Sequence, residues 1–67
     1  MVQRNRFQNN VVNYRRRSGY TQVMLALYLG VSRSYLSDVE TGKANPSLRM
    51  MEDLADALQV ELWRLFI

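Results

Sequence analysis

Four polar side chains follow Ser32 at a spacing that places them on one face of a helix. They are Arg33, Ser34, Ser37 and Asp38, at relative positions i, i+1, i+4 and i+5. An arginine on such a face can donate two hydrogen bonds to atoms O6 and N7 of guanine, whereas a serine hydroxyl bonds several bases with little discrimination. Every solvent-facing helix has a polar face, but such a row at the N-terminal end of a helix that enters the major groove of DNA contacts bases or phosphates. We therefore expect Arg33 to contact DNA, with Ser34 and Ser37 either beside it or merely solvated.

Asp38 is the exception in this row, because a carboxylate near phosphates is repelled. It could accept a hydrogen bond from a cytosine amino group. It could instead pair with Arg33 or with an arginine of a partner, or it could lie outside the groove. The sequence leaves all three roles open.

Two short helices must position this polar face. Thr21 and Ser32 are suited to cap their N-termini, and Gly30 between them is suited to the left-handed backbone that ends a helix. We predict helices over residues 22–29 and 33–40. Their inward side chains would be Val23, Leu25, Ala26 and Leu29 in the first, and Leu36 and Val39 in the second, with Val31 just ahead of it. Two helices joined by so short a turn indicate a helix-turn-helix.

The same residues resemble the Cro/CI-type (XRE) helix-turn-helix family. The resemblance rests on the run Gln22-x-x-Leu25-Ala26-x-x-x-Gly30-Val31-Ser32-x-x-x-Leu36-Ser37-x-Val39-Glu40-x-Gly42, followed by Asn45-Pro46-Ser47 and a leucine-rich helix. It extends from about Tyr14 to Phe66. It implies an all-α, five-helix, lambda-repressor-like DNA-binding domain, which we expect to occupy residues 1–67 as a single domain.

Three further helices complete the expected fold. The first begins at Asn5 or Arg6 and ends at Arg17, and the fourth covers residues 48–58 behind the cap Ser47. A short fifth helix covers residues 61–66. The inward side chains would be Phe7, Val11 and Tyr14 in the first helix, and Leu48, Met51, Leu54, Ala55 and Leu58 in the fourth. The family usually has a glycine and then a serine before the last helix, where this chain has Gln59 and Glu61.

The resemblance also implies contacts with the DNA backbone. A glutamine in the position of Gln22 grips a phosphate in the family, assisted by the positive end of its helix; the alternative is a solvated surface glutamine. Lys43 and Asn45 lie in the loop that follows the DNA backbone in the family. We expect Lys43 to contact phosphate, whereas Asn45 could equally shape the loop.

Three more residues belong to the predicted DNA-contacting set. The hydroxyl of Tyr35 could reach a phosphate while its ring packs, or the whole side chain could simply pack. Ser32 is included as the cap of the same helix. Arg17 faces either solvent or phosphate.

Arg15 and Glu40 are a predicted ion pair. They occupy the positions where the family joins an arginine of the first helix to a glutamate that ends the third. A glutamate at the negative end of its own helix is otherwise unfavourable, which favours a cationic partner.

The apolar surplus of the chain lies in its last helix. Leu62, Trp63, Phe66 and Ile67 crowd the C-terminus beside Leu65. A domain of 67 residues is unable to bury all of them easily, so we predict a homodimer interface there. The alternative is that they cover the base of the core.

Composition excludes several classes of protein. The chain has no cysteine and no histidine, and it shows neither a catalytic acid–base pair nor a metal cluster. We expect no enzyme, no metal, no cofactor and no small-molecule ligand. No apolar run is long enough to cross a membrane, so we expect a cytoplasmic, nucleoid-associated protein. All six acidic residues lie from Asp38 onward, and the arginine-rich front half fits a polyanion.

Together these observations predict a sequence-specific transcriptional regulator. We expect it to bind double-stranded DNA as a homodimer on a palindromic operator, most simply as a repressor. One alternative is an antitoxin that also binds a toxin through its apolar tail. Another is a helix-turn-helix module for protein interaction, against which the acid-free front half argues.

Overall fold

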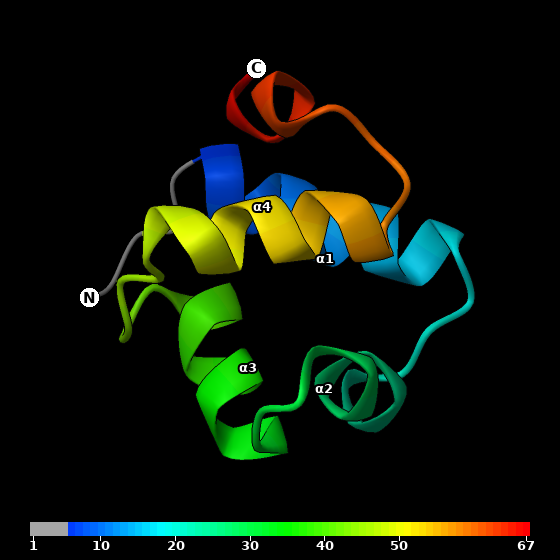
Figure 1. Ribbon diagram of the computed structural model, residues 1–67, viewed down its shortest axis with the longest axis vertical. Coiled ribbons are helices and arrows are strands. Elements are labelled where there is room, and N and C mark those ends of the chain that lie inside the picture. The colour runs from blue at the N-terminus through cyan, green and yellow to red at the C-terminus, as the bar shows by residue number, and fades with distance from the viewer. Residues whose placement is uncertain (1–5) are drawn as a thin grey trace.

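The computed structural model describes residues 6–67, and their regular structure is entirely helical (Figure 1). The elements are α1 (Arg6–Arg17), α2 (Gln22–Leu29), α3 (Arg33–Thr41), α4 (Leu48–Ala57) and the 3-10 helix η1 (Leu62–Phe66). The all-helical fold is therefore confirmed. The expected count of five is not, because the described residues form four α-helices and the last segment is a 3-10 helix. The possible start of the first helix at Asn5 lies outside the described residues.

Local chemistry accounts for where the inner helices begin. The hydroxyls of Thr21, Ser32 and Ser47 accept hydrogen bonds of 3.0–3.1 Å from the backbone N–H three residues on. Each bond satisfies a donor that a helix N-terminus otherwise leaves without a partner. Gly30 ends α2 in the left-handed conformation with φ 73°, and Gly42 ends α3 in the same way with φ 85°. The three predicted caps are confirmed.

The junction before η1 uses different residues. Gln59 has a φ of 59°, and among the described residues it is the one residue other than glycine whose φ is positive. Glu61 stands at the N-cap of η1 but makes no side-chain capping hydrogen bond. The segment that follows is only five residues long, and helical pieces this short are often 3-10. This explains why the last helix departs from the expected α-helix.

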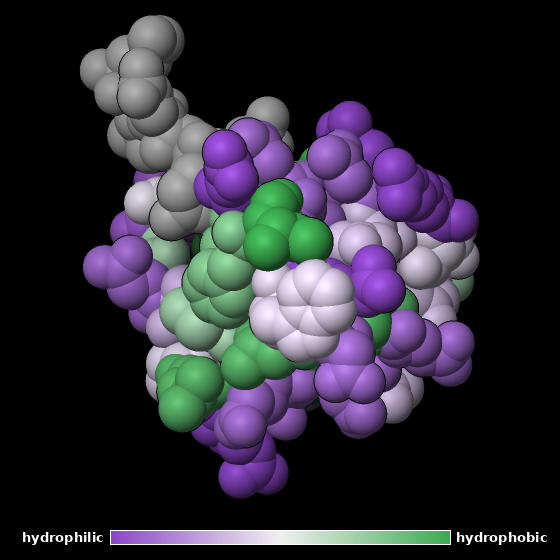
Figure 2. Space-filling model, turned by 90° about the horizontal axis from the view of Figure 1, so that it is seen from above, coloured by the Kyte–Doolittle hydropathy of each residue, from purple (hydrophilic) through white to green (hydrophobic). Residues whose placement is uncertain are grey.

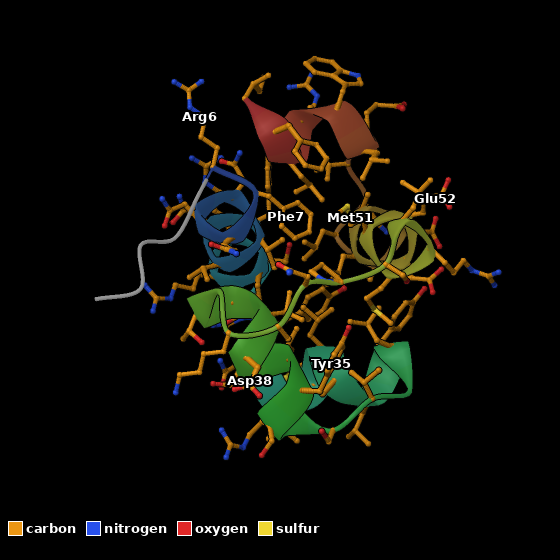
Figure 3. All side chains as sticks on the ribbon, turned by 90° about the vertical axis from the view of Figure 1, so that its left-hand side faces the viewer. Arg6, Phe7, Tyr35, Asp38, Met51 and Glu52 are labelled. Carbon is orange, nitrogen blue, oxygen red and sulfur yellow. The ribbon has the colours of Figure 1, made fainter. Side chains whose placement is uncertain are left out.

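Every element contributes to one core. The largest fully buried side chains are Val11 of α1, Leu25 of α2, Leu36 and Val39 of α3, Leu54 of α4 and Leu65 of η1. Phe7 and Met51 point into the interior from α1 and α4, whereas Arg6 and Glu52 point away from it (Figure 3). Burial of these side chains is what fixes the helices to one another.

Two of the predicted inward residues are exposed. Val23 lies on the surface of α2, because the buried face of that helix is set by Leu25 and Ala26 and two positions along a helix are about 200° apart. Leu48 is also exposed, because it lies one turn before Glu52 on the solvent face of α4. Both predictions were wrong for the same reason: each helix turns a narrower face to the core than its apolar pattern indicated.

The arrangement separates two surfaces. Helices α1 and α4 lie between the α2–α3 pair at one end of the molecule and η1 at the other (Figure 1). The polar face of α3 and the apolar C-terminal segment are therefore remote from each other.

Candidate nucleic-acid interface

The polar row on α3 lies at the surface near the N-terminal end of that helix. Ser32, Arg33 and Ser34 are exposed, and Ser37 is half-buried. The Oγ atom of Ser32 already accepts the N–H of Tyr35 at 3.0 Å, which fixes the first turn of α3. The guanidinium of Arg33 is thus presented by a capped, ordered helix end, where its donors can address a base edge or a phosphate.

A chain of hydrogen bonds ties this surface to the interior. Arg33 Nη1 lies 3.4 Å from Gln22 Oε1, and Gln22 Nε2 donates to Glu40 Oε1 at 2.9 Å. Glu40 in turn accepts from Arg15, with Nε–Oε2 at 2.6 Å and Nη2–Oε1 at 3.1 Å. Gln22 is therefore not simply solvated, since both ends of its amide have partners within the chain.

The ion pair at the base of this chain is buried. The side chains of Arg15 and Glu40 are 10% and 3% exposed, and Arg15 Nη1 also donates to the carbonyl oxygen of Tyr20 at 2.9 Å. Two parallel bonds between guanidinium and carboxylate give the pair a defined geometry. Among the described residues no buried side-chain nitrogen or oxygen lacks a hydrogen-bond partner. The pair thereby joins the end of α3 to α1. The hydrogen bond from Gln22 to Glu40 joins the start of α2 to the same pair.

Asp38 is half-buried on α3. Its backbone oxygen accepts the N–H groups of Lys43 at 2.8 Å and Ala44 at 3.1 Å, which fixes the loop after α3. Within residues 6–67 the ion pairs are Arg15–Glu40 and Arg49–Asp53, so the proposed pair between Asp38 and Arg33 is absent. Cytosine, a partner's arginine and a position outside the groove remain as its possible roles.

The other predicted contacts are spread around this face. Tyr35 is half-buried and packs against the core (Figure 3). Lys43 and Asn45 are exposed in the loop between α3 and α4. Arg17 is exposed at the end of α1, with its guanidinium carbon 5.7 Å from the centre of the Tyr14 ring.

The C-terminal segment presents apolar side chains at the opposite end. Trp63 is 54% exposed, and Phe66 and Ile67 are also exposed, whereas Leu62 is half-buried. The ring of Phe66 stacks on Phe7 at 5.2 Å between centroids, yet the residue is 47% exposed. Figure 2 looks onto this end and shows apolar surface gathered there. We call Leu62, Trp63, Phe66 and Ile67 the C-terminal patch.

A second apolar surface was missed. Val23, Met24, Leu27 and Tyr28 are all exposed on α2, so the expectation that the surplus lies only in the last helix was wrong. The sequence carried a signal of this surface, because residues 22–29 contain no charged side chain. In the structure, Leu25 and Ala26 are the buried residues of that helix. A short helix that is apolar all round exposes part of its apolar surface unless it is fully enclosed.

The residues that the structure describes offer neither a metal-binding cluster nor a membrane-spanning helix. They contain no group of three or more His, Cys, Asp or Glu side chains that could hold a metal ion. None of the helices that they form is long and apolar enough to cross a membrane.

Comparison with known proteins gives one consistent result. The helix-turn-helix family model matches residues 12–62. The chain is 46% identical over 54 residues to the HTH-type transcriptional regulator SlrR of Bacillus subtilis, covering 79% of this chain and 36% of that protein. It is 48% identical over 42 residues to the immunity repressor protein of Bacillus phage phi105, covering 63% of this chain and 29% of that protein. The chain thus spans about a third of the length of these two relatives.

Solved structures agree with this result. The restriction-modification controller protein C.AhdI from Aeromonas hydrophila superposes with a TM-score of 0.85 at 38% identity, covering 91% of this chain and 92% of that one. SinR, the master regulator for biofilm formation, solved in complex with DNA, gives a TM-score of 0.81 at 33% identity, covering 88% of this chain and 95% of that one.

Proposed function

The chain belongs to the Cro/CI-type (XRE) helix-turn-helix family, and on that premise we propose that it is a sequence-specific DNA-binding transcriptional regulator. The observation that carries the proposal is the exposed Arg33 on the capped N-terminus of α3, next to Gln22 and the buried ion pair behind it. A side chain that reads base edges must be held in place before it meets the groove. The relative SinR was solved in complex with DNA, which supports the same partner here.

Reading and anchoring are assigned to different residues. Arg33 reads a guanine in the major groove, with Ser34 and Ser37 beside it. Ser32, Gln22, Lys43 and Asn45 bind phosphates on either side of α3, together with Tyr35 and Arg17 at the margins. Gln22 meets the phosphate with the amide N–H that is not donated to Glu40.

The regulator acts as a homodimer joined by the C-terminal patch. One domain of this size reads only a few base pairs, and a two-fold dimer doubles the base contacts. The two recognition helices then enter successive major grooves about 34 Å apart, on an operator with two-fold symmetry. Repression is the simplest outcome of such occupancy, and one relative of the chain is named an immunity repressor.

Selection of bound sites from random duplex DNA, at a stated salt concentration, tests this proposal. We expect a palindromic consensus that contains a guanine in each half-site. Arg33→Ala should reduce the preference for that guanine by about 1–3 kcal/mol. Arg49→Ala is the matched control, because Arg49 is an exposed arginine on α4 and should leave the consensus unchanged. Enrichment of no sequence would contradict specific reading, and a consensus without symmetry would contradict the dimer.

Salt dependence tests the phosphate contacts separately. A lysine that neutralises one phosphate releases about 0.9 counterions, so Lys43→Ala should reduce the log–log salt slope of binding by about 1. It should weaken binding to all sequences alike. A slope equal to that of the unaltered chain would place Lys43 away from the DNA backbone.

A further inference from the structure

The outward face of α2 is an apolar surface that the rest of the fold leaves exposed. Its four members recur at positions i, i+1, i+4 and i+5, and Leu27 and Tyr28 are 76% and 70% exposed. They are Val23, Met24, Leu27 and Tyr28, which we call the α2 face. Exposed apolar patches of this kind mark interaction sites, whereas single exposed apolar residues are ordinary.

An acidic hollow adjoins the α2 face. It has a volume of about 150 Å³ and is lined by Tyr28 and Leu29 of α2 and by Asp53 and Asp56 of α4. Within residues 6–67, the ion pair of Asp53 is with Arg49 of its own helix, at 3.4 Å. Asp56 is exposed and forms no ion pair within residues 6–67. An aromatic ring beside two carboxylates is a suitable receptor for the cationic end of a lysine or arginine.

Charge selects among the molecules that could cover this surface. In a two-fold contact between copies, each subunit would present the same patch, so Asp53 and Asp56 would lie close to the same carboxylates of the other copy. DNA is disfavoured for the same reason, because its phosphates are negative. An apolar helix face bordered by carboxylates complements an amphipathic helix whose apolar stripe is bordered by lysine or arginine.

We propose that the α2 face and the adjoining hollow bind a basic amphipathic helix of a different protein. Leucine-like side chains of that helix would cover Met24 and Leu27, and a lysine or arginine would enter the hollow beside Tyr28. The C-terminal patch is made by η1, at the other end of the molecule, and Arg33 lies on α3. The partner would therefore bind while the C-terminal patch remains uncovered.

The probe is a designed peptide of about five helical turns, with leucines on one face and lysines along its borders. Its binding to the isotope-labelled chain is followed by the amide NMR shifts. A second peptide with glutamate in place of each lysine is the control for charge. The chain has a net charge of +3, so non-selective attraction would favour the glutamate peptide. We expect the lysine peptide to bind more tightly and to shift amides of α2 and of residues 53–56.

Three variants test the assignment. Leu27→Gln should lower the affinity for the lysine peptide by about tenfold or more, as loss of a central apolar contact does at interfaces. The double variant Asp53→Asn with Asp56→Asn should remove the preference for lysine over glutamate. Leu48→Gln is the matched control, because Leu48 is an exposed leucine at the start of α4, outside the α2 face. It should change the affinity by less than about twofold.

The following outcomes would overturn the proposal. Shifts confined to η1, equal binding of both peptides, or an unchanged affinity of Leu27→Gln would show that the α2 face is not the receptor. A change in the sedimentation of Leu27→Gln without peptide would make a second copy of this chain the occupant. A loss of binding to random duplex DNA in that variant would make DNA the occupant.

Discussion

The two ends of this molecule solve the same structural problem with different residues. The turn between α2 and α3 has Gly30 in the left-handed position and Ser32 as a cap whose hydroxyl accepts a hydrogen bond. The junction between α4 and η1 has Gln59 at φ 59° and Glu61 without a capping bond. The first arrangement precedes a nine-residue α-helix, and the second precedes a five-residue 3-10 helix.

The forces that hold the two ends also differ. The α2–α3 end is tied to α1 by the buried ion pair of Arg15 with Glu40, and Gln22 adds a partly buried bond to Glu40. The C-terminal end is held by burial of Leu65, by the stacking of Phe66, and by longer bonds of 3.3–3.4 Å from Asn10 to backbone oxygens. Directional bonds between charged groups fix positions more narrowly than apolar packing does. The α2–α3 end is therefore held in a defined geometry, whereas the C-terminal end leaves apolar side chains exposed.

The largest expected effect comes from breaking the buried bonds of the first end. Arg15→Met leaves the buried carboxylate of Glu40 without its cationic partner. Glu40→Gln leaves the buried guanidinium of Arg15 without its anionic partner. We expect each single variant to lower the free energy of unfolding by about 3 kcal/mol. The double variant should cost less than the sum of the two, because it leaves no buried charge behind. Thermal and denaturant melts of all three variants measure this.

The exposed ion pair on α4 is the matched control for that experiment. Arg49 and Asp53 are also an arginine and a carboxylate, but their atoms are 3.4 Å apart and both side chains are solvated. Arg49→Met and Asp53→Asn should each change the unfolding free energy by less than about 1 kcal/mol. Equal effects of the two pairs would mean that Arg15–Glu40 is worth no more than a surface contact, and the contrast between the ends would fail.

The next largest effect concerns the exposed apolar side chains of the C-terminal patch. Trp63→Ala removes the largest exposed side chain of the C-terminal patch. It should weaken dimerisation by about 2 kcal/mol, as loss of a central tryptophan does at interfaces, while helicity is retained. In the proposed homodimer, the operator gives both subunits base-specific contacts, so operator binding should fall more than non-specific binding. Sedimentation equilibrium and far-ultraviolet circular dichroism measure the two quantities separately.

Leu48→Ala is the control for that variant, since it removes an exposed leucine outside the C-terminal patch and should leave association unchanged. A Trp63→Ala chain that unfolds would make Trp63 a stabilising part of the fold. A chain that remains dimeric would move the interface to other residues.

The sequence predicted those parts of the fold that depend on neighbouring residues. Thr21, Ser32 and Ser47 cap helices at the expected positions, and Gly30 ends α2, because capping is decided within a few residues. The predicted bounds of α2 agree with the structure, and those of α3 and α4 differ by one residue. The joining of Arg15 to Glu40 came from the family resemblance and not from local pattern.

Other features depend on how much of each helix the rest of the chain covers. Val23 and Leu48 have apolar side chains in helical register, but no other helix covers them. The bond between Gln22 and Glu40 joins residues 18 positions apart, so no local signal indicated it. The only sign of the positive φ at Gln59 in the sequence was that this chain lacks the glycine that the family usually has before its last helix. The roles of the candidate DNA-contacting residues remain predictions, since they depend on a partner outside the chain.

The smallest expected effects come from exchanging glycine and non-glycine residues at the left-handed positions of the two ends, Gly30 and Gln59. A side chain in the left-handed conformation costs about 1–2 kcal/mol, because its Cβ approaches the next carbonyl oxygen. Apart from Gly30 itself and its two neighbours in the chain, no atom lies within 4 Å of a Cβ added there, so Gly30→Ala would be penalised for its backbone conformation alone. We expect it to lower the free energy of unfolding by about 1 kcal/mol. Gln59→Gly should raise it by about 0.5–1 kcal/mol, because relief of strain exceeds the added entropy of the unfolded glycine.

Two further variants distinguish backbone strain from loss of the Gln59 side chain. Gln59→Asn keeps a Cβ but tolerates the left-handed region, so its stability should lie between those of the glutamine and glycine forms. Gln59→Ala keeps the Cβ and the strain, so it should gain nothing. Stabilisation by Gln59→Ala as large as by Gln59→Gly would show that the glutamine side chain, and not its backbone, is unfavourable. In that case the two ends would differ only in their contacts, and the left-handed residue at each turn would have no part in the contrast between them.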